Sequence, residues 1–199
     1  MIRQSFLVLL VFFQSCSIDL GYIQLLREAT AQNRIEITDE LSKSIDASFI
    51  KVSKGRNDAI FVLSNSVNHL DTWVGSNFEK VITYKGLVVK TLGLEYDIAF
   101  NTLDYQNNLF ISNFLSTISF SNPEYKFAEA TFILNEKDLI NTNSDCDREI
   151  IYTKEISHIG FSFDDWFCFK DNRISRTIQR ISPFDDEIII EFHYKFNNL

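Results

Sequence analysis

The chain has 199 residues, and its 27 Asp and Glu outnumber its 19 Lys and Arg to give a formal net charge of −8. This length suffices for one domain with a sizeable core. The acidic balance argues against nucleic acid as a partner and against electrostatic docking on anionic lipid. Only two prolines and six glycines occur, so no linker rich in these residues divides the chain.

The first fifteen residues predict a signal peptide. Arg3 precedes the apolar run Phe6–Phe13, which is too short to cross a hydrocarbon core of roughly 30 Å as a helix. A serine and then Cys16 follow, an order that looks like the lipobox of bacterial lipoprotein precursors, in which a diacylglycerol is attached to the cysteine and the chain is cut before it. Phe13 and Gln14 depart from the usual lipobox residues. The alternatives are an ordinary cleaved signal with an incidental cysteine, or a core strand.

Cleavage before Cys16 would leave one domain, residues 16–199, with a formal charge of −9, since the signal contains Arg3 and no acid. The domain would attach to the membrane through the lipid on Cys16, because stable anchoring takes at least two acyl chains and a diacylglyceryl group supplies them. Ser17, rather than Asp, follows the cysteine. In the lipoproteins of enteric bacteria that this signal resembles, this favours sorting to the outer membrane.

The next segments predict a short helical start followed by strands. Leu20, Ile23 and Leu26 have helical spacing in a segment that ends near Asn33, and Thr38–Leu41 resembles the start of a second short helix. Residues 59–63 are apolar on both faces and predict a central strand. Two strands at 80–84 and 87–91 flank Lys85-Gly86, a tight hairpin signal.

The second half predicts further antiparallel strands. Residues 97–115 are less regular, and strand character returns at 125–134. Residues 149–159, 162–170 and 173–181 form a predicted meander with turns at Gly160 and Asp171-Asn172. In the last strand Ile188, Ile190, Phe192, Tyr194 and Phe196 alternate with mostly polar residues. We therefore expect an all-β fold: a single antiparallel sheet of about eight to ten strands, curled into a barrel or half-barrel, with a short N-terminal helix.

Cys146 and Cys168 follow the lipobox cysteine. An oxidising periplasm would allow them to form a disulfide, and their spacing resembles no zinc motif. The alternative is two separate small apolar residues, because the sequence alone does not set the geometry of a disulfide.

No residue pattern indicates catalysis. His69, His158 and His193 lack metal-ligand spacing, so we expect no metal and no cofactor. Asp164-Asp165 and Asp185-Asp186 are paired carboxylates of the kind that sugar hydrolases use. Neighbours on a strand point to opposite faces, however, and pairs in turns are usually solvated. The sequence predicts that the protein is not an enzyme.

Trp73 and Trp166 are the candidate contacts for a glycan or a partner protein. Asp71 and Thr72 precede the first tryptophan, and Asp164 and Asp165 precede the second. An aromatic face beside carboxylates and hydroxyls can stack on a sugar ring and bond its hydroxyls. The alternative is that both are large core or rim residues.

Two stretches resemble the YjbF/GfcB family, the group 4 capsule polysaccharide lipoproteins: Trp73 together with residues 81–94 (VITYKGLVVKTLGL), and residues 166–183 (WFCFKDNRISRTIQRISP). The layout of signal, short helix, strand-rich body and final strand is also similar, whereas residues 101–143 match poorly. The resemblance implies a barrel-like outer-membrane lipoprotein that faces the periplasm and is encoded beside genes for exopolysaccharide or capsule production and export.

Three functions stay open from the sequence. The first is a non-catalytic accessory to polysaccharide secretion that binds glycan or an export protein. The second is a carrier of lipid or lipoprotein with an apolar half-barrel cavity. The third is a small integral outer-membrane barrel, whose strands would alternate in a similar way.

Overall fold

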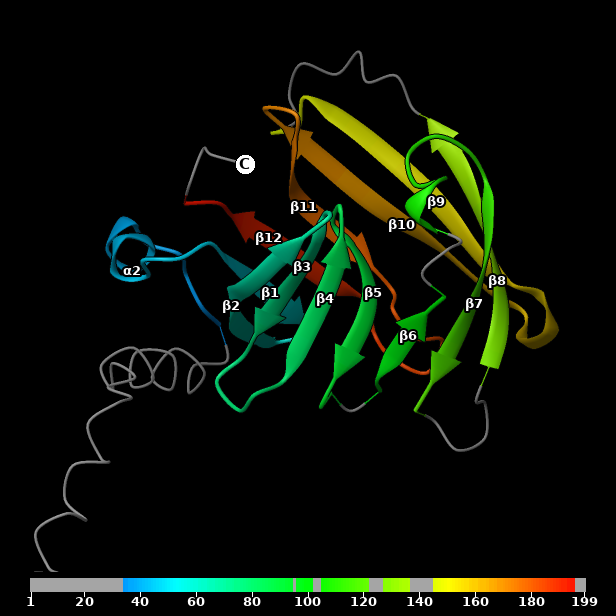
Figure 1. Cartoon of the computed structure of the whole chain (residues 1–199), viewed down its shortest axis with the longest axis horizontal. Helices are drawn as coiled ribbons and strands as arrows, with labels where there is room; N and C mark the ends of the chain where they lie inside the picture. Colours follow the sequence, from blue (N-terminus) through cyan, green and yellow to red (C-terminus); the bar gives the residue numbers. More distant parts are fainter. Residues whose placement is uncertain (1–33, 95, 102–104, 122–126, 137–144, 196–199) are drawn as a thin grey trace, which may run out of the picture.

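Twelve antiparallel strands close into a barrel in the computed structural model, which describes residues 34–94, 96–101, 105–121, 127–136 and 145–195 (Figure 1). Each strand pairs with its neighbours in sequence, and β12 pairs with β1 to complete the circle. Among the described residues the strands are β1 (Phe49–Lys54), β2 (Asn57–Val67), β3 (Leu70–Val74), β4 (Lys80–Tyr84), β5 (Leu87–Leu92), β6 (Ile98–Phe100), β7 (Phe114–Phe120), β8 (Phe127–Glu136), β9 (Arg148–Ile156), β10 (Phe161–Lys170), β11 (Arg173–Gln179) and β12 (Ile188–His193).

The all-β prediction is confirmed, and the sheet is a closed barrel rather than a half-barrel. The estimate of eight to ten strands was too low, because no strand was delimited at the positions of β1, β3, β6 and β7. The last strand ends at His193 rather than at residue 196. The predicted signal peptide, Cys16 and the helix expected to end near Asn33 lie outside the described residues. Where the structure describes the chain, no helix has both the length and the apolar character to cross a membrane.

The predicted second helix is present as α2 (Asp39–Ser44), beside the barrel in Figure 1. The Thr38 hydroxyl caps it by accepting a hydrogen bond from the Leu41 backbone N–H at 3.2 Å. The α2 region covers the outer face of β1 and β2 with a small apolar cluster built from Ile35, Ile37, Leu41, Ile45, Phe49, Ile60 and Val62. Strand β2 thus buries both faces, since Ile60 joins this cluster while Phe61 points into the barrel. This explains the doubly apolar stretch in the sequence.

Large side chains fill the barrel interior. Trp73, Phe132, Tyr152 and Phe167 are each at most 1% exposed and come from four different strands. Tyr152 packs edge-on against both Phe132 and Phe167. Burying side chains of this size supplies much of the stabilisation of a small barrel.

Three hairpins turn at the same end of the barrel, because successive strands run in opposite directions. Their two-residue turns are Asn68-His69, Lys85-Gly86 and Asp171-Asn172. Both residues of each turn have positive φ, between 48° and 86°. Two-residue hairpin turns of this kind match the twist of the strands that flank them. The turns predicted at Lys85-Gly86 and Asp171-Asn172 are therefore confirmed. We call this end of the barrel the mouth.

Candidate binding site at the mouth of the barrel

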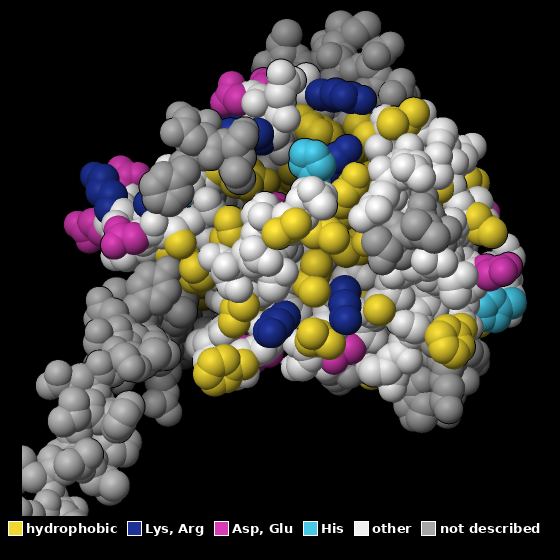
Figure 2. Space-filling model, viewed as in Figure 1, with side chains coloured by type: hydrophobic (Ala, Val, Ile, Leu, Met, Phe, Trp, Pro, Cys, Tyr) yellow, Lys and Arg dark blue, Asp and Glu magenta, His cyan; other side chains and the backbone are white. Residues whose placement is uncertain are grey.

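A cavity of about 800 Å³ opens at the mouth between the three turns. Figure 2 shows hydrophobic side chains in a hollow near the top of the view, with histidine and basic side chains beside it. Its lining combines apolar, hydroxyl and charged groups, contributed by Ser48, Leu63, Ser66, His69, Asp71, Lys85, Phe110, Phe169, Asn172, Arg173, Ile174 and Tyr194. The mixture suits a ligand with both polar groups and flat apolar faces.

Opposite walls of the barrel meet beside this cavity. A Cβ on Gly86 would lie 2.9 Å from the Ile174 side chain, so glycine is required where the β4–β5 turn approaches β11. The buried Gln179 side chain reinforces the contact by donating to the Gly86 carbonyl at 2.8 Å and accepting from the Val88 N–H at 3.0 Å. These bonds hold the β4–β5 hairpin against β11 and place Lys85 and Arg173 on one cavity.

Aromatic rings support both of these cations. The Lys85 Nζ lies 5.3 Å from the centre of the Tyr84 ring, and the Arg173 Cζ lies 5.6 Å from the centre of the Tyr194 ring. Such cation–π contacts orient a charged group without neutralising it. Tyr194 is 39% exposed, so part of its surface is available to a ligand.

Asp71 is the acidic group of the cavity. Its carboxylate accepts a hydrogen bond from the Ser66 hydroxyl at 2.6 Å. Burial raises the pKa of Asp71 above its ordinary value, against the opposing effects of the Ser66 hydrogen bond and of His69. Burial also raises the pKa of the Tyr194 hydroxyl, with a further contribution from the Asp71 charge and an opposing one from Arg173. Asp71, Tyr194 and Arg173 therefore form one electrostatic group.

A second acidic group lies inside the barrel, away from any solvent. The Lys154 Nζ donates to Asp165 at 2.9 and 3.2 Å and also to the Arg180 carbonyl. The Arg180 N–H donates to Asp165 at 3.0 Å. Asp165 is fully buried, and burial raises its pKa, whereas Lys154 and the Arg180 N–H oppose that rise. Asp165 points inward and Asp164 is exposed, so this pair lies on opposite faces of β10, as expected for neighbours on a strand.

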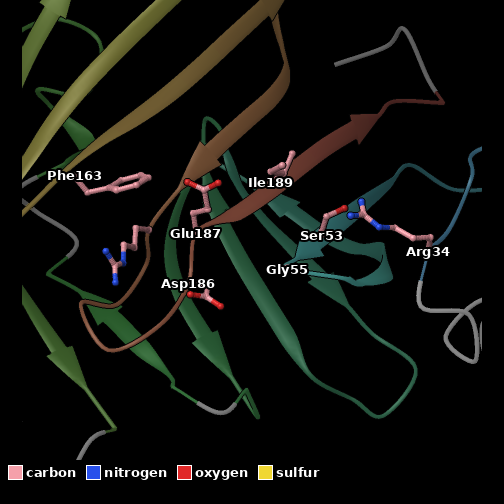
Figure 3. Close-up of a pocket in the computed structure, with 8 residues that line it drawn as sticks. Arg34, Ser53, Gly55, Phe163, Asp186, Glu187 and Ile189 are labelled. Atoms are coloured by element: carbon pink, nitrogen blue, oxygen red, sulfur yellow. The ribbon is translucent and has the colours of Figure 1, made fainter.

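A smaller pocket of about 490 Å³ lies near the opposite end of the strands. In Figure 3 Arg34 extends toward Ser53, and Asp186 and Glu187 lie between these residues and Phe163. Its two arginines, Arg34 and Arg180, balance its two carboxylates, so it has no charge preference. It is a weaker candidate than the mouth.

The structure separates the two candidate tryptophans. Trp73 is fully buried, packs edge-on against Phe192, and donates its indole N–H to the Thr83 hydroxyl at 2.9 Å. Of the two roles left open for Trp73, glycan contact and core residue, the structure shows the core role, since a buried indole offers no face to a ligand. Trp166 is half-buried on the outer face of β10, between Ile151 and Ile178 of the neighbouring strands.

Cys146 and Cys168 form a disulfide, with their Cα atoms 5.4 Å apart. It links the end of β10 to the residues that precede β9. Two hydrogen bonds lie beside it: the Asp147 N–H donates to the Phe169 carbonyl at 2.8 Å, and the Asp171 N–H donates to the Asp147 carboxylate at 2.6 Å. This bridge fixes the wall that carries Phe169 into the mouth.

The three histidines lie in three different environments. His69 is exposed in a turn of the mouth, and His158 is exposed in a short 3-10 helix, Ser157–Ile159. His193 lies on the outer face, stacked on Phe49 with ring centres 4.6 Å apart, and burial lowers its pKa. Within the part of the chain that the structure describes, no group of three or more His, Cys, Asp or Glu side chains is arranged to hold a metal ion.

Sequence reasoning missed the mouth as a site. Lys85 and Asn172 were assigned only to turns, and Arg173 and Tyr194 only to strands. The usable signal was the alternation of strand direction, which brings the turns after β2, β4 and β10 to one end. This alone would have gathered His69, Lys85 and Asn172.

The fold is shared with a solved protein. A hypothetical lipoprotein, YmcC from Escherichia coli (K12), superposes with a TM-score of 0.71 at 14% sequence identity, over 94% of this chain and 99% of that chain. At this identity the likeness concerns the fold alone. No curated protein matches the sequence.

The sequence also matches a family model. The model describes the group 4 capsule polysaccharide lipoprotein gfcB, YjbF, and it aligns with residues 10–192, which include the barrel except for the last residue of β12. The resemblance around Trp73 and residues 166–183 is thus confirmed, and the chain belongs to the YjbF family of group 4 capsule polysaccharide lipoproteins.

Proposed function

We propose that this protein is a lipoprotein accessory to the production or export of capsule or exopolysaccharide, acting without catalysis. The observation that carries the proposal is the family match over residues 10–192. In this proposal a lipid on Cys16 anchors the barrel to the outer membrane, and the barrel faces the periplasm. It acts by binding polysaccharide or an export protein.

The arrangement of the carboxylates supports a non-catalytic role. Hydrolysis of a glycosidic bond uses two carboxyl groups that face the same bond, about 5 to 10 Å apart. Asp164 points outward and Asp165 points into the barrel, where Lys154 holds it. Asp71 is the acidic residue that lines the mouth cavity. The mouth therefore offers recognition groups rather than a pair of reacting acids.

The carrier of lipid or lipoprotein is the second candidate, favoured by the apolar residues Leu63, Phe110 and Phe169 in the mouth. The accessory role is preferred because Trp73 and Phe132 fill the space where an acyl chain would lie. An integral barrel would present an apolar band to lipid. Lys90, Glu129 and Arg176 instead place exposed charges on the outer face of three strands.

The role is tested by measuring surface and secreted polysaccharide in a deletion strain. We expect a clear decrease with normal sugar-nucleotide pools, and restoration by the wild-type gene. Cys16→Ala should fail to restore polysaccharide because the barrel is no longer anchored, whereas the matched control Ser17→Ala should restore it. Unchanged polysaccharide in the deletion strain, under conditions where the wild-type protein is made, would reject the role.

Localisation is tested in the same strains by membrane fractionation and mass spectrometry of the N-terminal peptide. We expect a diacylglyceryl group on Cys16 and protein in the outer-membrane fraction. Ser17→Asp should move the lipidated protein to the inner membrane. An unmodified Cys16 thiol in the wild-type protein would contradict the anchoring proposal.

A further inference from the structure

The mouth has a local charge opposite to that of the chain. Lys85 and Arg173 face the cavity against one acid, Asp71, whereas the whole chain has a formal charge of −8. His69 lies on the same rim. A positive site on an acidic protein attracts anionic ligands, whereas the acidic remainder of the surface repels them.

The two cations are held as a pair by the fold. The contact of Gly86 with Ile174 brings the residues beside them, Lys85 and Arg173, to the same cavity although they are far apart in sequence. Their supporting rings fix where each charge sits. An ammonium group and a planar guanidinium group together suit a carboxylate or phosphate, because the guanidinium can bind two oxygens at once.

The rest of the lining suits a sugar ring. Tyr194 offers a partly exposed aromatic side chain, which also contacts Arg173 and stacks on Phe192. Ser48, Ser66 and Asn172 supply groups that can donate to or accept from hydroxyls. A fatty acid would need an apolar sleeve continuing into the barrel. Below the cavity that space contains Trp73 and Phe167, each 0% exposed.

We infer that the mouth binds an acidic polysaccharide, with a carboxylate or phosphate of the glycan between Lys85 and Arg173 and a sugar ring against the exposed part of the Tyr194 side chain. The inference rests on the proposed function, which makes the ligand a polysaccharide. The cationic residues of the mouth indicate that this polysaccharide is acidic. Asp71 acts against the ligand, so its burial, which disfavours its negative charge, assists binding.

The test measures binding of hexagalacturonate to the full-length protein in a non-ionic detergent by titration calorimetry. The fully methyl-esterified hexamer is the uncharged control with the same sugar skeleton, and laurate is the lipid probe. We expect saturable binding of the acid form, weakened by salt, and at least tenfold weaker binding of the ester. Lys85→Gln and Arg173→Gln should each weaken binding about tenfold, as expected for losing one charge-assisted bond.

Two further variants sharpen the result. Lys90→Gln removes the same charge from an exposed position on the outer face of β5 and should leave affinity within about twofold, since exposed charges outside the site are screened. Asp71→Asn should tighten binding about threefold by removing a repulsive charge. All variants should keep the wild-type circular dichroism spectrum, so that binding is not confused with folding.

Equal binding of acid and ester, no saturable binding of either, or an equal effect of Lys90→Gln would overturn the inference. Binding of laurate without hexagalacturonate would overturn it in favour of the lipid carrier. These outcomes are separate from the polysaccharide phenotype. Loss of polysaccharide in the deletion strain without hexagalacturonate binding would keep the accessory role and assign it to a partner protein.

Discussion

The barrel interior and the mouth each contain an acidic residue whose pKa is raised by burial, and the two residues have different environments. Asp165 is fully buried and is held by the Lys154 ammonium group and the Arg180 backbone. Asp71 is only partly buried and has a hydroxyl partner, Ser66, at 2.6 Å. Burial raises the pKa of both. The strength of the counter-charge is what distinguishes them.

This difference predicts how each carboxylate responds when its partner is removed. A carboxylate inside a packed barrel persists because every oxygen has a partner, and removing a partner leaves a desolvated charge. A carboxylate at the mouth can exchange its partner for water or a ligand at little cost. We therefore expect substitutions in the interior to affect mainly stability, and substitutions at the mouth to affect mainly the proposed binding.

The largest expected effect is at the interior pair. Asp165→Asn leaves the Lys154 ammonium group buried without a counter-charge, which should lower the free energy of unfolding by about 3–5 kcal/mol. Asp164→Asn is the matched control, because it makes the same change one residue away on the exposed face, and it should cost under about 0.5 kcal/mol. Urea unfolding followed by circular dichroism measures both. Equal costs at the two positions would remove the distinction between buried and exposed acids on β10.

The next effect is at the wall between the two regions. Replacing Cys146 and Cys168 together by Ala opens a loop whose ends are 22 residues apart, which should cost about 3 kcal/mol and lower Tm by about 6–12 °C for a chain of this size. Scanning calorimetry with and without reductant measures this. The wild-type protein in reductant should approach the variant. If reductant left the wild-type Tm unchanged while the bond was broken, the bridge would not stabilise this wall.

The sequence predicted the fold where its pattern matched the packing. The alternation of Ile188, Ile190 and Phe192 corresponds to three inward-facing residues of β12, and Lys85-Gly86 forms its tight turn. Strand β7 escaped prediction because its pattern is inverted in part: Ser116 is buried, and Leu115 is 55% exposed. Local alternation cannot reveal such exceptions, since they depend on what lies across the barrel.

Strand β3 escaped for another reason. The end of β2 is polar at Asn65 and Ser66, where the strand extends beyond the core to the mouth. These residues resembled a turn, so the hairpin that leads into β3 was not recognised. The site itself depends on the contact between Gly86 and Ile174, which joins distant hairpins. Residue type and spacing do not predict this contact, because it forms only when the barrel closes.

The smallest expected effect is Asp71→Asn on stability, and its sign tests the environment of the mouth. Because burial raises the pKa of Asp71, the folded protein holds this proton more tightly than the unfolded chain does. The stabilisation is complete below the ordinary aspartate pKa and is lost as the pH rises through the raised value. Asn cannot ionise, and its amide oxygen can still accept the Ser66 hydrogen bond, so the variant avoids this loss. Its urea midpoint relative to the wild type should rise slightly between about pH 3 and pH 7, and Asp164→Asn serves again as the exposed control. A midpoint that falls with pH relative to the wild type would mean that the Asp71 charge is stabilised by its neighbours, as in a structural ion pair, and the mouth would then resemble the interior.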